Sequence, residues 1–298
     1  MTRPDAAAPW PTAATRPIFL FGWPVKHSLS PQIHNAAFAE QALDNVYLAA
    51  PTPPEQLDAV IESLGLIGAI GANVTVPHKQ AVYELCDVHT DEAELIGAVN
   101  TLVWSTEGLL GDNTDATGLR DAITADVHIE AGANVLLFGS GGAARAAVVA
   151  TGRLGANVTV AARRPDAAAE LAELALRAGA ASARSVDSAD TSTLSHAAKT
   201  ALLVMNTTPL GMSGETLPDA LMELGPGQIA YDLIYEPAET PFLAAARTCG
   251  AQVHNGLGML VAQAAASYRR WTGVDAPIGL MSAVATAALA ERARSSSR

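Results

Sequence analysis

The sequence predicts an α/β protein of two domains. Its 298 residues suit two domains, and short apolar segments alternate with segments of helical spacing along the whole chain. A glycine cluster at 139–142 follows one of the apolar runs. Alternation of this kind favours parallel strands joined by helical crossovers. Hydrophobic residues make up 49% and charged residues 16% of the chain, which indicates a globular protein.

Apolar runs and helix-start signals place the individual elements. Ser30 followed by Pro31, for example, marks the start of a helix. Strands are expected at 18–22, 45–50, 67–76, 96–104, 134–138, 157–162, 201–206 and 229–235. Helices are expected at 32–42, 54–64, from 79, from near 117, after the glycine cluster, near 240–243, through 263–268 and at 279–292.

Composition argues against several classes of protein. The formal net charge of −12 disfavours binding to nucleic acid or to an anionic membrane surface. Cys86 and Cys249 lack the spacing of metal ligands, so we expect two reduced, buried thiols in a cytoplasmic protein and no metal site. No apolar run approaches the roughly 18 to 20 residues that cross a bilayer. Residues 1–15 are expected to form a disordered tail.

The segment 134–145 places the glycine cluster between a buried strand and an alanine-rich helix. This context binds a dinucleotide pyrophosphate, because glycines admit the phosphates and the helix N-terminus offers free N–H groups. The loop residues are Gly139, Ser140, Gly141, Gly142 and Ala143. A glycine-rich turn without a ligand is the alternative. We expect a Rossmann domain here.

The next strand of this domain ends in Arg163 and Arg164. A site that prefers NAD carries an acidic residue about 20 residues past the loop, where it holds the ribose 2′-hydroxyl. Two arginines stand there instead, and their guanidinium groups suit a 2′-phosphate. Two exposed arginines on a turn are the alternative. The interpretation we adopt is NADP.

Polar residues follow several strands expected in the first half. Ser28 and Ser30 lie near a helix N-terminus, which can bind a carboxylate, although a capping role for Ser30 is the alternative. Asn73, Thr75 and Lys79 are expected at one edge of the sheet, where open α/β sheets bind ligands. By itself, Lys79 would be interpreted as a solvated surface residue.

Two carboxylates, Asp112 and Asp115, stand just before a predicted helix. Together with the polar residues between them they form a candidate functional segment. A cluster of Asp and Asn residues that caps the helix is the alternative, since such residues commonly precede helices. From spacing alone both interpretations stay open.

These segments together resemble the shikimate dehydrogenase family. The matching segments are 21–22, 27–31, 73–79, 97–101, 111–115, the glycine loop, 206–208, 231–235 and 256–263. The resemblance covers residues 18–289, with the segments in order, and together they are highly specific. It implies an oxidoreductase that uses NADP to reduce 3-dehydroshikimate reversibly to shikimate. This reaction belongs to the shikimate pathway, which leads to chorismate and the aromatic amino acids.

The resemblance also implies roles for individual residues. Ser28 and Ser30 match residues that hold the substrate carboxylate, and Lys79 and Asp115 match the catalytic pair that exchanges a proton with the C3 oxygen. Substrate contacts are implied for Thr75, Asn100, Asp115, Tyr235 and Gln263. Cofactor contacts are implied for Gly139, Ser140, Gly141, Gly142, Ala143, Ala162, Arg163, Arg164, Thr207, Leu233 and Gly256.

The chain departs from the family pattern at two places. Ala162, Arg163 and Arg164 stand where the family often carries Asn-Arg-Thr, which leaves the contacts at the adenosine end open. His78 stands where an aromatic residue is common, and we interpret it as a packing variant.

The order of the sites predicts a discontinuous substrate domain. It is expected to comprise 16–115 and 257–298, with the C-terminal helices packing back on it, and the Rossmann domain to comprise 116–256. The cleft between the two is the expected active site. Family analogy suggests a monomer or homodimer, with a small-molecule substrate and neither nucleic acid nor membrane as a partner.

Two other functions compete with this one. A dual quinate/shikimate dehydrogenase that prefers NAD is disfavoured because no acid replaces Arg163, and because Ser30 is serine where quinate-preferring members often have threonine. A regulatory protein that binds NADP without turnover is disfavoured because Lys79 and Asp115 are both retained.

Overall fold

The computed structural model describes residues 11–296. The chain divides into two compact units: unit 1 comprises Met1–Thr114 and Gln263–Arg298, and unit 2 comprises Asp115–Ala262. The chain passes from unit 1 to unit 2 after Thr114 and returns to unit 1 inside helix α10 (Leu257–Thr272). The first residues of α10 belong to unit 2, and the remainder belongs to unit 1. This division differs from the boundaries expected at 115/116 and 256/257 because a helix start does not mark where packing changes.

Part of the expected tail at 1–15 is ordered. Residues 1–10 lie outside the described part of the chain. The hydroxyls of Thr12 and Thr15 donate hydrogen bonds to the two carboxylate oxygens of Asp44, at 2.7 Å and 2.6 Å. The expectation of disorder is therefore wrong for residues 12–15, since one carboxylate holds both threonines against unit 1.

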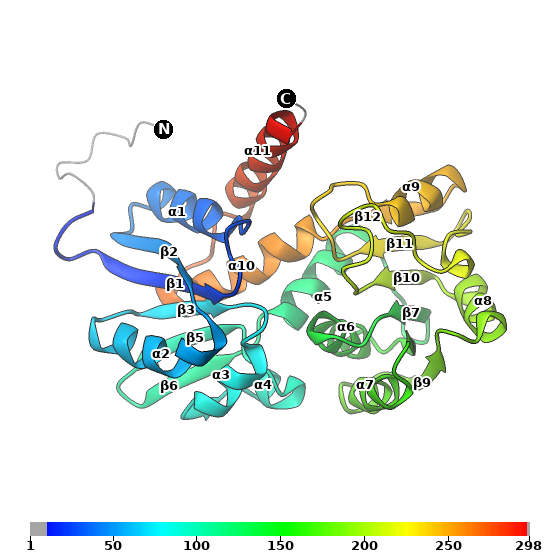
Figure 1. Cartoon of the computed structure of the whole chain (residues 1–298), viewed down its shortest axis with the longest axis horizontal. Coiled ribbons are helices and arrows are strands. Elements are labelled where there is room, and N and C mark those ends of the chain that lie inside the picture. Colours follow the sequence, from blue (N-terminus) through cyan, green and yellow to red (C-terminus); the bar gives the residue numbers. More distant parts are fainter. Residues whose placement is uncertain (1–10, 297–298) are drawn as a thin grey trace. The chain divides into compact units, whose positions relative to one another are not determined.

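Unit 1 contains a six-stranded sheet in the order β2-β1-β3-β5-β6-β4 (Figure 1). Its strands are β1 (Arg16–Gly22), β2 (Asn45–Pro51), β3 (Gly71–Val74), β4 (Val88–His89), β5 (Thr101–Ser105) and β6 (Gly108–Asp112). Its helices are α1 (Ser30–Glu40), the 3-10 turn η1 (Pro54–Gln56), α2 (Leu57–Leu66), α3 (Lys79–Leu85), α4 (Asp91–Ile96), the later part of α10, and α11 (Ile278–Ser296). Helix α11 packs against α1, so the C-terminal segment completes this unit.

The sheet of unit 1 is mixed, which corrects the expectation of parallel pairing. Strand β5 runs antiparallel to both β3 and β6. The reason lies in the connection between β5 and β6, where two residues, Thr106 and Glu107, separate the strands. A link this short joins only antiparallel neighbours, whereas a parallel pair needs a crossover of a dozen residues or more.

Unit 2 contains an all-parallel sheet in the order β12-β11-β10-β7-β8-β9. Its strands are β7 (Asn134–Phe138), β8 (Asn157–Ala162), β9 (Ser182–Asp187), β10 (Leu203–Asn206), β11 (Ile229–Asp232) and β12 (Gln252–His254). Its helices are α5 (Asp115–Asp126), α6 (Gly142–Arg153), α7 (Pro165–Arg177), α8 (Thr191–Thr200), the 3-10 turn η2 (Asp219–Leu221), α9 (Pro241–Thr248) and the start of α10. Numbered within the unit, the strand order is 6-5-4-1-2-3, that of a Rossmann fold, with its switch point between β7 and β10.

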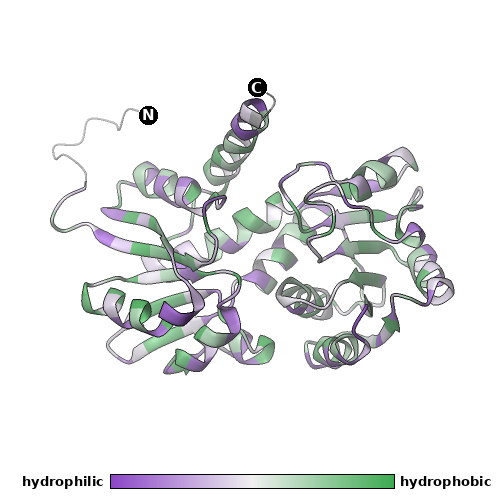
Figure 2. Cartoon of the chain, in the orientation of Figure 1, coloured by the Kyte–Doolittle hydropathy of each residue, from purple (hydrophilic) through white to green (hydrophobic). Residues whose placement is uncertain are grey.

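The central strands of unit 2 are buried along their length. Residues 135–138 of β7 and 203–206 of β10 are buried, and Figure 2 shows hydrophobic residues along these strands. Continuous burial is typical of a parallel strand covered on both faces. The predicted strands at 134–138 and 157–162 are confirmed to the residue, because each apolar run is bounded by polar or glycine residues.

Other elements differ from the sequence expectations. The strand expected at 96–104 begins only at Thr101, because Ile96 ends α4 and Gly97 closes that helix with a φ of 69°. The strand expected at 67–76 is limited to 71–74. Strand β9 was not expected, since only Val186 of its six residues is buried and its pattern resembles that of a loop.

An aromatic cluster in unit 1 surrounds a buried histidine. The His34 ring stacks on Tyr47, with 4.4 Å between centroids, and lies 5.3 Å from the ring of Trp271. Neither ring nitrogen has a hydrogen-bond partner among the described residues. Burial lowers the pKa of His34 to about 3, because the charged ring would lose its hydration without gaining a partner.

This histidine makes stability depend on pH. Below pH 6.5 the unfolded chain binds a proton at His34 and the folded protein does not. The free energy of unfolding therefore decreases as the pH is lowered from 6.5 to 3, by up to about 1.4 kcal/mol per pH unit. Urea unfolding at several pH values should show a shallower dependence for His34→Phe than for the wild type. His27→Gln is the control, since His27 is exposed. Equal slopes for wild type and His34→Phe would contradict this account.

Candidate active site

Several residues predicted to contact substrate lie at the end of the unit 1 sheet where the parallel strands β1, β2 and β3 finish. We call this end of the sheet its carboxyl edge. Thr75 follows β3, and Lys79 is the first residue of α3. Asn100 precedes β5, and because β5 is antiparallel its beginning lies at this same edge. There the Val74 N–H donates to the Asn100 carbonyl oxygen at 2.8 Å. The error in strand direction therefore does not displace Asn100 from the expected edge.

Ser28 and Ser30 stand at the start of α1. Ser30 is the first helical residue, Leu29 occupies the N-cap position, and no side chain among the described residues caps this helix. The capping interpretation of Ser30 is thus wrong, because a residue already in helical conformation cannot turn its hydroxyl back to the first-turn N–H groups. The Ser30 N–H instead donates to Ser28 Oγ at 3.2 Å, which holds the two serines together.

The half-buried Lys79 begins α3 on a fixed support. Its carbonyl oxygen accepts the N–H of Val99 at 2.8 Å, which ties the start of α3 to the segment before β5. The preceding residue, His78, is buried, and its Nε2 hydrogen-bonds to the carbonyl oxygen of Thr52 at 2.7 Å. This bond agrees with the interpretation of His78 as a packing residue.

The two neighbouring carboxylates have different surroundings. Asp112 is buried and accepts hydrogen bonds from Thr90 Oγ1 and from Arg270 Nε, both at 2.6 Å. It therefore joins α4 and α10 to the end of β6. Asp115 is buried at the first position of α5, immediately after Thr114. The bonds to Thr90 and Arg270 engage both Asp112 oxygens and give this residue a structural role, whereas acid–base chemistry at Asp115 stays a prediction.

Asn73 and Gln263 also separate into different roles. The Asn73 amide is buried: its Oδ1 accepts from the Tyr47 hydroxyl at 2.8 Å, and its Nδ2 donates to Ser267 Oγ at 3.0 Å. These bonds give Asn73 a structural role inside unit 1. Gln263 lies on α10, one helical turn before Ser267, whose hydroxyl donates to the Gln263 carbonyl oxygen at 3.1 Å.

In unit 2, the glycine loop follows the carboxyl end of β7. Gly139 has a φ of 126°, and a Cβ there would collide with Thr207, so this position requires glycine. Gly141 and Gly142 are exposed, and a Cβ at either would meet nothing within 4 Å. Gly141 is the N-cap of α6, and no side chain of the described residues caps that helix. An open, uncapped helix N-terminus of this kind fits a pyrophosphate.

Arg163 and Arg164 follow β8 directly after Ala162. Arg164 reaches back to the glycine loop, where Nη2 donates to the carbonyl oxygen of Ser140 at 3.2 Å. Arg163 is exposed. The structure thus places a positive pair beside the loop, where an NAD-preferring protein has a carboxylate. These residues fit a 2′-phosphorylated cofactor.

The loops after β10, β11 and β12 carry the remaining predicted cofactor residues. Thr207 Oγ1 donates to the carbonyl oxygen of Phe138 at 2.8 Å, which fastens this loop to β7. Gly256 lies so close to the backbone of Leu233 that a Cβ would overlap the Leu233 carbonyl group. Its N–H donates to the Ile234 carbonyl oxygen at 3.0 Å. Tyr235 is half-buried two residues after Leu233, on the same loop.

A buried carboxylate that the sequence analysis missed holds these loops in place. Asp232 accepts hydrogen bonds from Asn206 Nδ2 at 3.0 Å, from the Ile234 N–H at 3.0 Å and from Thr240 Oγ1 at 2.7 Å. Burial raises the pKa of Asp232, while these three donors lower it. The position of Asp232 at the last residue of a buried strand was the available signal.

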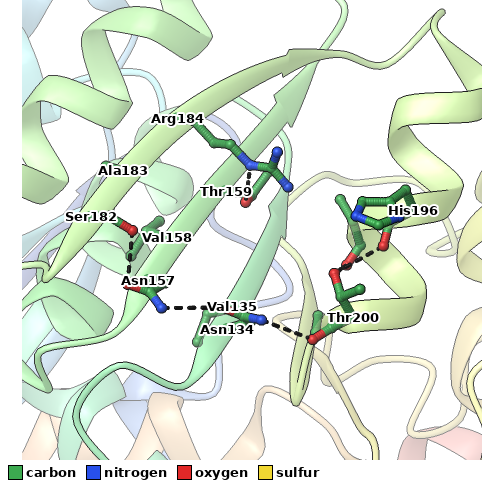
Figure 3. Close-up of a pocket in the computed structure, with 12 residues that line it drawn as sticks. Asn134, Val135, Asn157, Val158, Thr159, Ser182, Ala183, Arg184, His196 and Thr200 are labelled. Carbon is green, nitrogen blue, oxygen red and sulfur yellow. Dashed lines mark hydrogen bonds between the residues drawn. The ribbon is translucent and has the colours of Figure 1, made fainter.

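A separate cavity of about 370 Å³ lies at the opposite edge of this sheet. Figure 3 shows Asn134, Asn157 and Arg184 from the amino-terminal parts of three strands, with His196 from α8. Ligands of doubly wound sheets bind outside the carboxyl ends of the strands. We therefore assign the site to the glycine-loop edge and not to this cavity.

Cys86 is partly buried and Cys249 is exposed, so the expectation that both thiols are buried is wrong. Residues 11–296 include no group of three or more His, Cys, Asp or Glu side chains that could hold a metal ion. Within the same range, no helix has the length and apolar character needed to span a membrane.

A Rossmann sheet with an open glycine loop, combined with a second α/β unit whose edge carries Lys79, defines a nicotinamide-dependent oxidoreductase. Two family models match the chain: the shikimate dehydrogenase substrate binding domain at residues 20–102, and the shikimate 5′-dehydrogenase C-terminal domain at residues 256–286. The chain belongs to the shikimate dehydrogenase family.

Individual relatives extend this similarity over most of the chain. Shikimate dehydrogenase (NADP(+)) of Citrifermentans bemidjiense is 44% identical over 91% of this chain and 94% of its own length. The Methanopyrus kandleri protein of the same name is 39% identical over 90% of this chain and 94% of its own length. The Thermus thermophilus shikimate 5-dehydrogenase in complex with NADP(H) and shikimate is 36% identical, with a TM-score of 0.81 over 92% of this chain and 100% of its own.

A relative with a different name has the same fold. The ligand-free 5-ketofructose reductase of Gluconobacter is 26% identical, with a TM-score of 0.81 over 92% of this chain and 98% of its own. The fold therefore does not determine the substrate by itself.

The contact between Gly256 and Leu233 can be tested by adding one carbon. Gly256→Ala should displace the Leu233 backbone, destabilise unit 2 by about 1–3 kcal/mol and weaken NADPH binding. Gly258→Ala is the matched control, because a Cβ there meets Ala122 at an ordinary 3.5 Å. Thermal unfolding and fluorescence titration with NADPH measure both effects. Unchanged stability and NADPH affinity in Gly256→Ala would show that the close approach has no consequence.

Proposed function

We propose that this chain catalyses the NADP-dependent, reversible reduction of 3-dehydroshikimate to shikimate. The observation that carries the proposal is the set of polar residues at the carboxyl edge of unit 1, around Lys79 and Asn100, in a chain whose relatives are named shikimate dehydrogenase (NADP(+)). The product would serve chorismate and aromatic amino-acid biosynthesis.

The proposed substrate contacts divide by chemical type. Ser28 and Ser30, held together by their own hydrogen bond, donate their hydroxyls to the substrate carboxylate. Thr75, Asn100 and Gln263 hydrogen-bond the ring hydroxyls. Tyr235, from the loop after β11, contributes on the substrate side.

The proposed cofactor contacts lie at the carboxyl edge of unit 2. The uncapped N–H groups at Gly141, Gly142 and Ala143 would hold the pyrophosphate, and Gly139 and Ser140 shape the approach. Ala162, Arg163 and Arg164 would surround the adenosine 2′-phosphate. Thr207, Leu233 and Gly256 would line the nicotinamide. The bound cofactor supplies the hydride.

Lys79 and Asp115 are the proposed proton-transfer pair. As the C3 carbonyl becomes an alcohol, its oxygen gains negative charge and a proton. The Lys79 ammonium stabilises that charge and donates the proton, and the Asp115 carboxylate orients the ammonium and the substrate hydroxyl. The reverse reaction uses the same groups in the opposite protonation states.

The two units have separate proposed ligands. We propose that unit 1 binds shikimate and that unit 2 binds NADP. The net charge of −12 supports a protein without nucleic-acid or membrane partners. We propose the cytoplasm as its location, and a monomer or homodimer as its state.

One assay tests this function against its rivals. The absorbance of reduced nicotinamide is followed with shikimate or quinate, each with NADP or NAD. Turnover of shikimate with NADP supports the proposal. Preference for quinate with NAD would support the dual-specificity enzyme, and absence of turnover with NADP still bound would support a regulator.

Removing the proposed proton donor should affect chemistry more than binding. Lys79→Ala is expected to lower kcat on the order of 10²- to 10⁴-fold, with a much smaller change in the KM of shikimate. Lys199→Ala, an exposed lysine in the last turn of α8, is the control. An unchanged kcat in a folded Lys79→Ala variant would remove Lys79 from the mechanism.

Reversing the charge at Arg163 should separate the two cofactors. Arg163→Asp is expected to raise the KM of NADPH about tenfold or more, because a charge-assisted bond is replaced by repulsion, and to change that of NADH little. Arg177→Asp, at the far end of α7, is the control for net charge. Equal losses for both cofactors would rule out recognition of the 2′-phosphate by Arg163.

A further inference from the structure

Three buried hydroxyls form a triangle beneath the edge of unit 1. Ser267 Oγ lies 2.8 Å from Thr101 Oγ1 and 3.0 Å from Thr114 Oγ1, and the two threonine oxygens are 3.3 Å apart. All three side chains are buried. They come from β5, from the segment before α5 and from α10, so the triangle joins segments far apart in the sequence.

Ser267, like each of the two threonines, has four polar contacts at its hydroxyl, and it is the member on α10. Besides the two threonine hydroxyls, it accepts the Asn73 amide at 3.0 Å and donates to the carbonyl oxygen of Gln263 at 3.1 Å. A serine hydroxyl has one proton and two lone pairs, so these four contacts exceed its capacity. At most three of the four are hydrogen bonds at one time, and all four partners pack around this one oxygen.

Asn100 connects the triangle to the substrate edge. Its Oδ1 accepts from Thr101 Oγ1 at 2.8 Å and from the Thr114 N–H at 2.8 Å, and its Nδ2 donates to Thr114 Oγ1 at 3.0 Å. The amide orientation of Asn100 therefore follows from the same hydroxyls that bond to Ser267.

The triangle also lies at both points where the chain crosses between units. Unit 1 ends at Thr114, and the next residue is Asp115. Unit 1 resumes at Gln263, which shares a face of α10 with Ser267 because the two are four residues apart. One hydroxyl thus fixes the residue before Asp115 and the helical turn that carries Gln263.

We propose that Ser267 is a positioning residue for the reaction, which sets Asn100, Asp115 and Gln263 for shikimate through this hydroxyl triangle. The inference rests on the proposed function. It assigns no contact between Ser267 and the substrate. Because the triangle lies in unit 1, its loss should affect shikimate and leave binding of the nicotinamide cofactor nearly unchanged.

Steady-state kinetics of Ser267→Ala test the proposal. The KM of shikimate should rise about tenfold, as expected for loss of one buried hydrogen-bonding group, and kcat should fall several-fold, while the KM of NADP changes less than about twofold. Ser267→Cys, which restores a weak donor, should recover part of the loss. Thr272→Val is the matched control, because the Thr272 hydroxyl bonds the carbonyl oxygens of Tyr268 and Val274 outside the triangle.

A double-mutant cycle with Thr101→Val distinguishes positioning from general destabilisation. If both residues act through the triangle, the double variant should raise the KM of shikimate by less than the product of the single effects. Isothermal calorimetry with shikimate alone should give the same ranking of affinities. If Ser267→Ala does not fold, the comparison of wild type with Ser267→Cys replaces it.

The outcomes separate this inference from the proposed function. An active wild type whose shikimate KM is unchanged in folded Ser267→Ala, or in Ser267→Cys where Ala does not fold, would overturn the inference alone. Equal losses for shikimate and NADP would also overturn it, since they would indicate a merely structural role. A wild type without shikimate turnover would overturn the proposed function, whatever the variants show.

Discussion

The constraint on which unit 1 depends is the burial of two asparagine amides. Asn73 and Asn100 lie inside the edge where the sheet meets α10, and a buried amide without partners costs several kcal/mol. Tyr47, Thr101, Thr114 and Ser267 meet that need. The same bonds hold the residues that we propose to contact substrate around Asn100, so structural stability and the shape of the proposed site arise from one set of contacts.

Unit 2 meets its ligand by a different physical principle. Its edge leaves space at Gly141 and Gly142, where no side chain of residues 11–296 caps the start of α6, and Arg163 and Arg164 bring positive charge. The buried Asp232 network keeps the surrounding loops rigid without lying at the open surface. Unit 1 is therefore organised by hydrogen bonds between buried side chains, and unit 2 by an open helix start and two arginines that suit an anion.

Sequence reasoning reached the glycine-loop part of the Rossmann unit because its signals are local, whereas β9, β12, α7 and α8 were not predicted. An apolar run, a glycine cluster and two arginines each lie within a short segment, and β7 and β8 were placed to the residue. The mixed sheet of unit 1 was missed because the direction of β5 depends on a hairpin between two segments that were interpreted separately. Ser267 and Asp232 were missed because a buried hydroxyl or carboxylate reveals its partners only after distant segments have packed.

The discontinuity of unit 1 has a consequence for how the protein is made. On the ribosome, β1 to β6 emerge first, but Ser267, Tyr268 and Trp271 on α10 come after the whole of unit 2. Until then Asn73 lacks its hydrogen-bond partner on α10. The carbonyl oxygen of Leu102 likewise lacks the indole N–H of Trp271, which donates to it at 2.9 Å in the folded protein. Unit 2, from 115 to 262, is continuous and requires no later residue for its sheet. The part of the chain synthesised first is thus the last to complete its core, and the nascent sheet must remain unaggregated throughout the intervening translation.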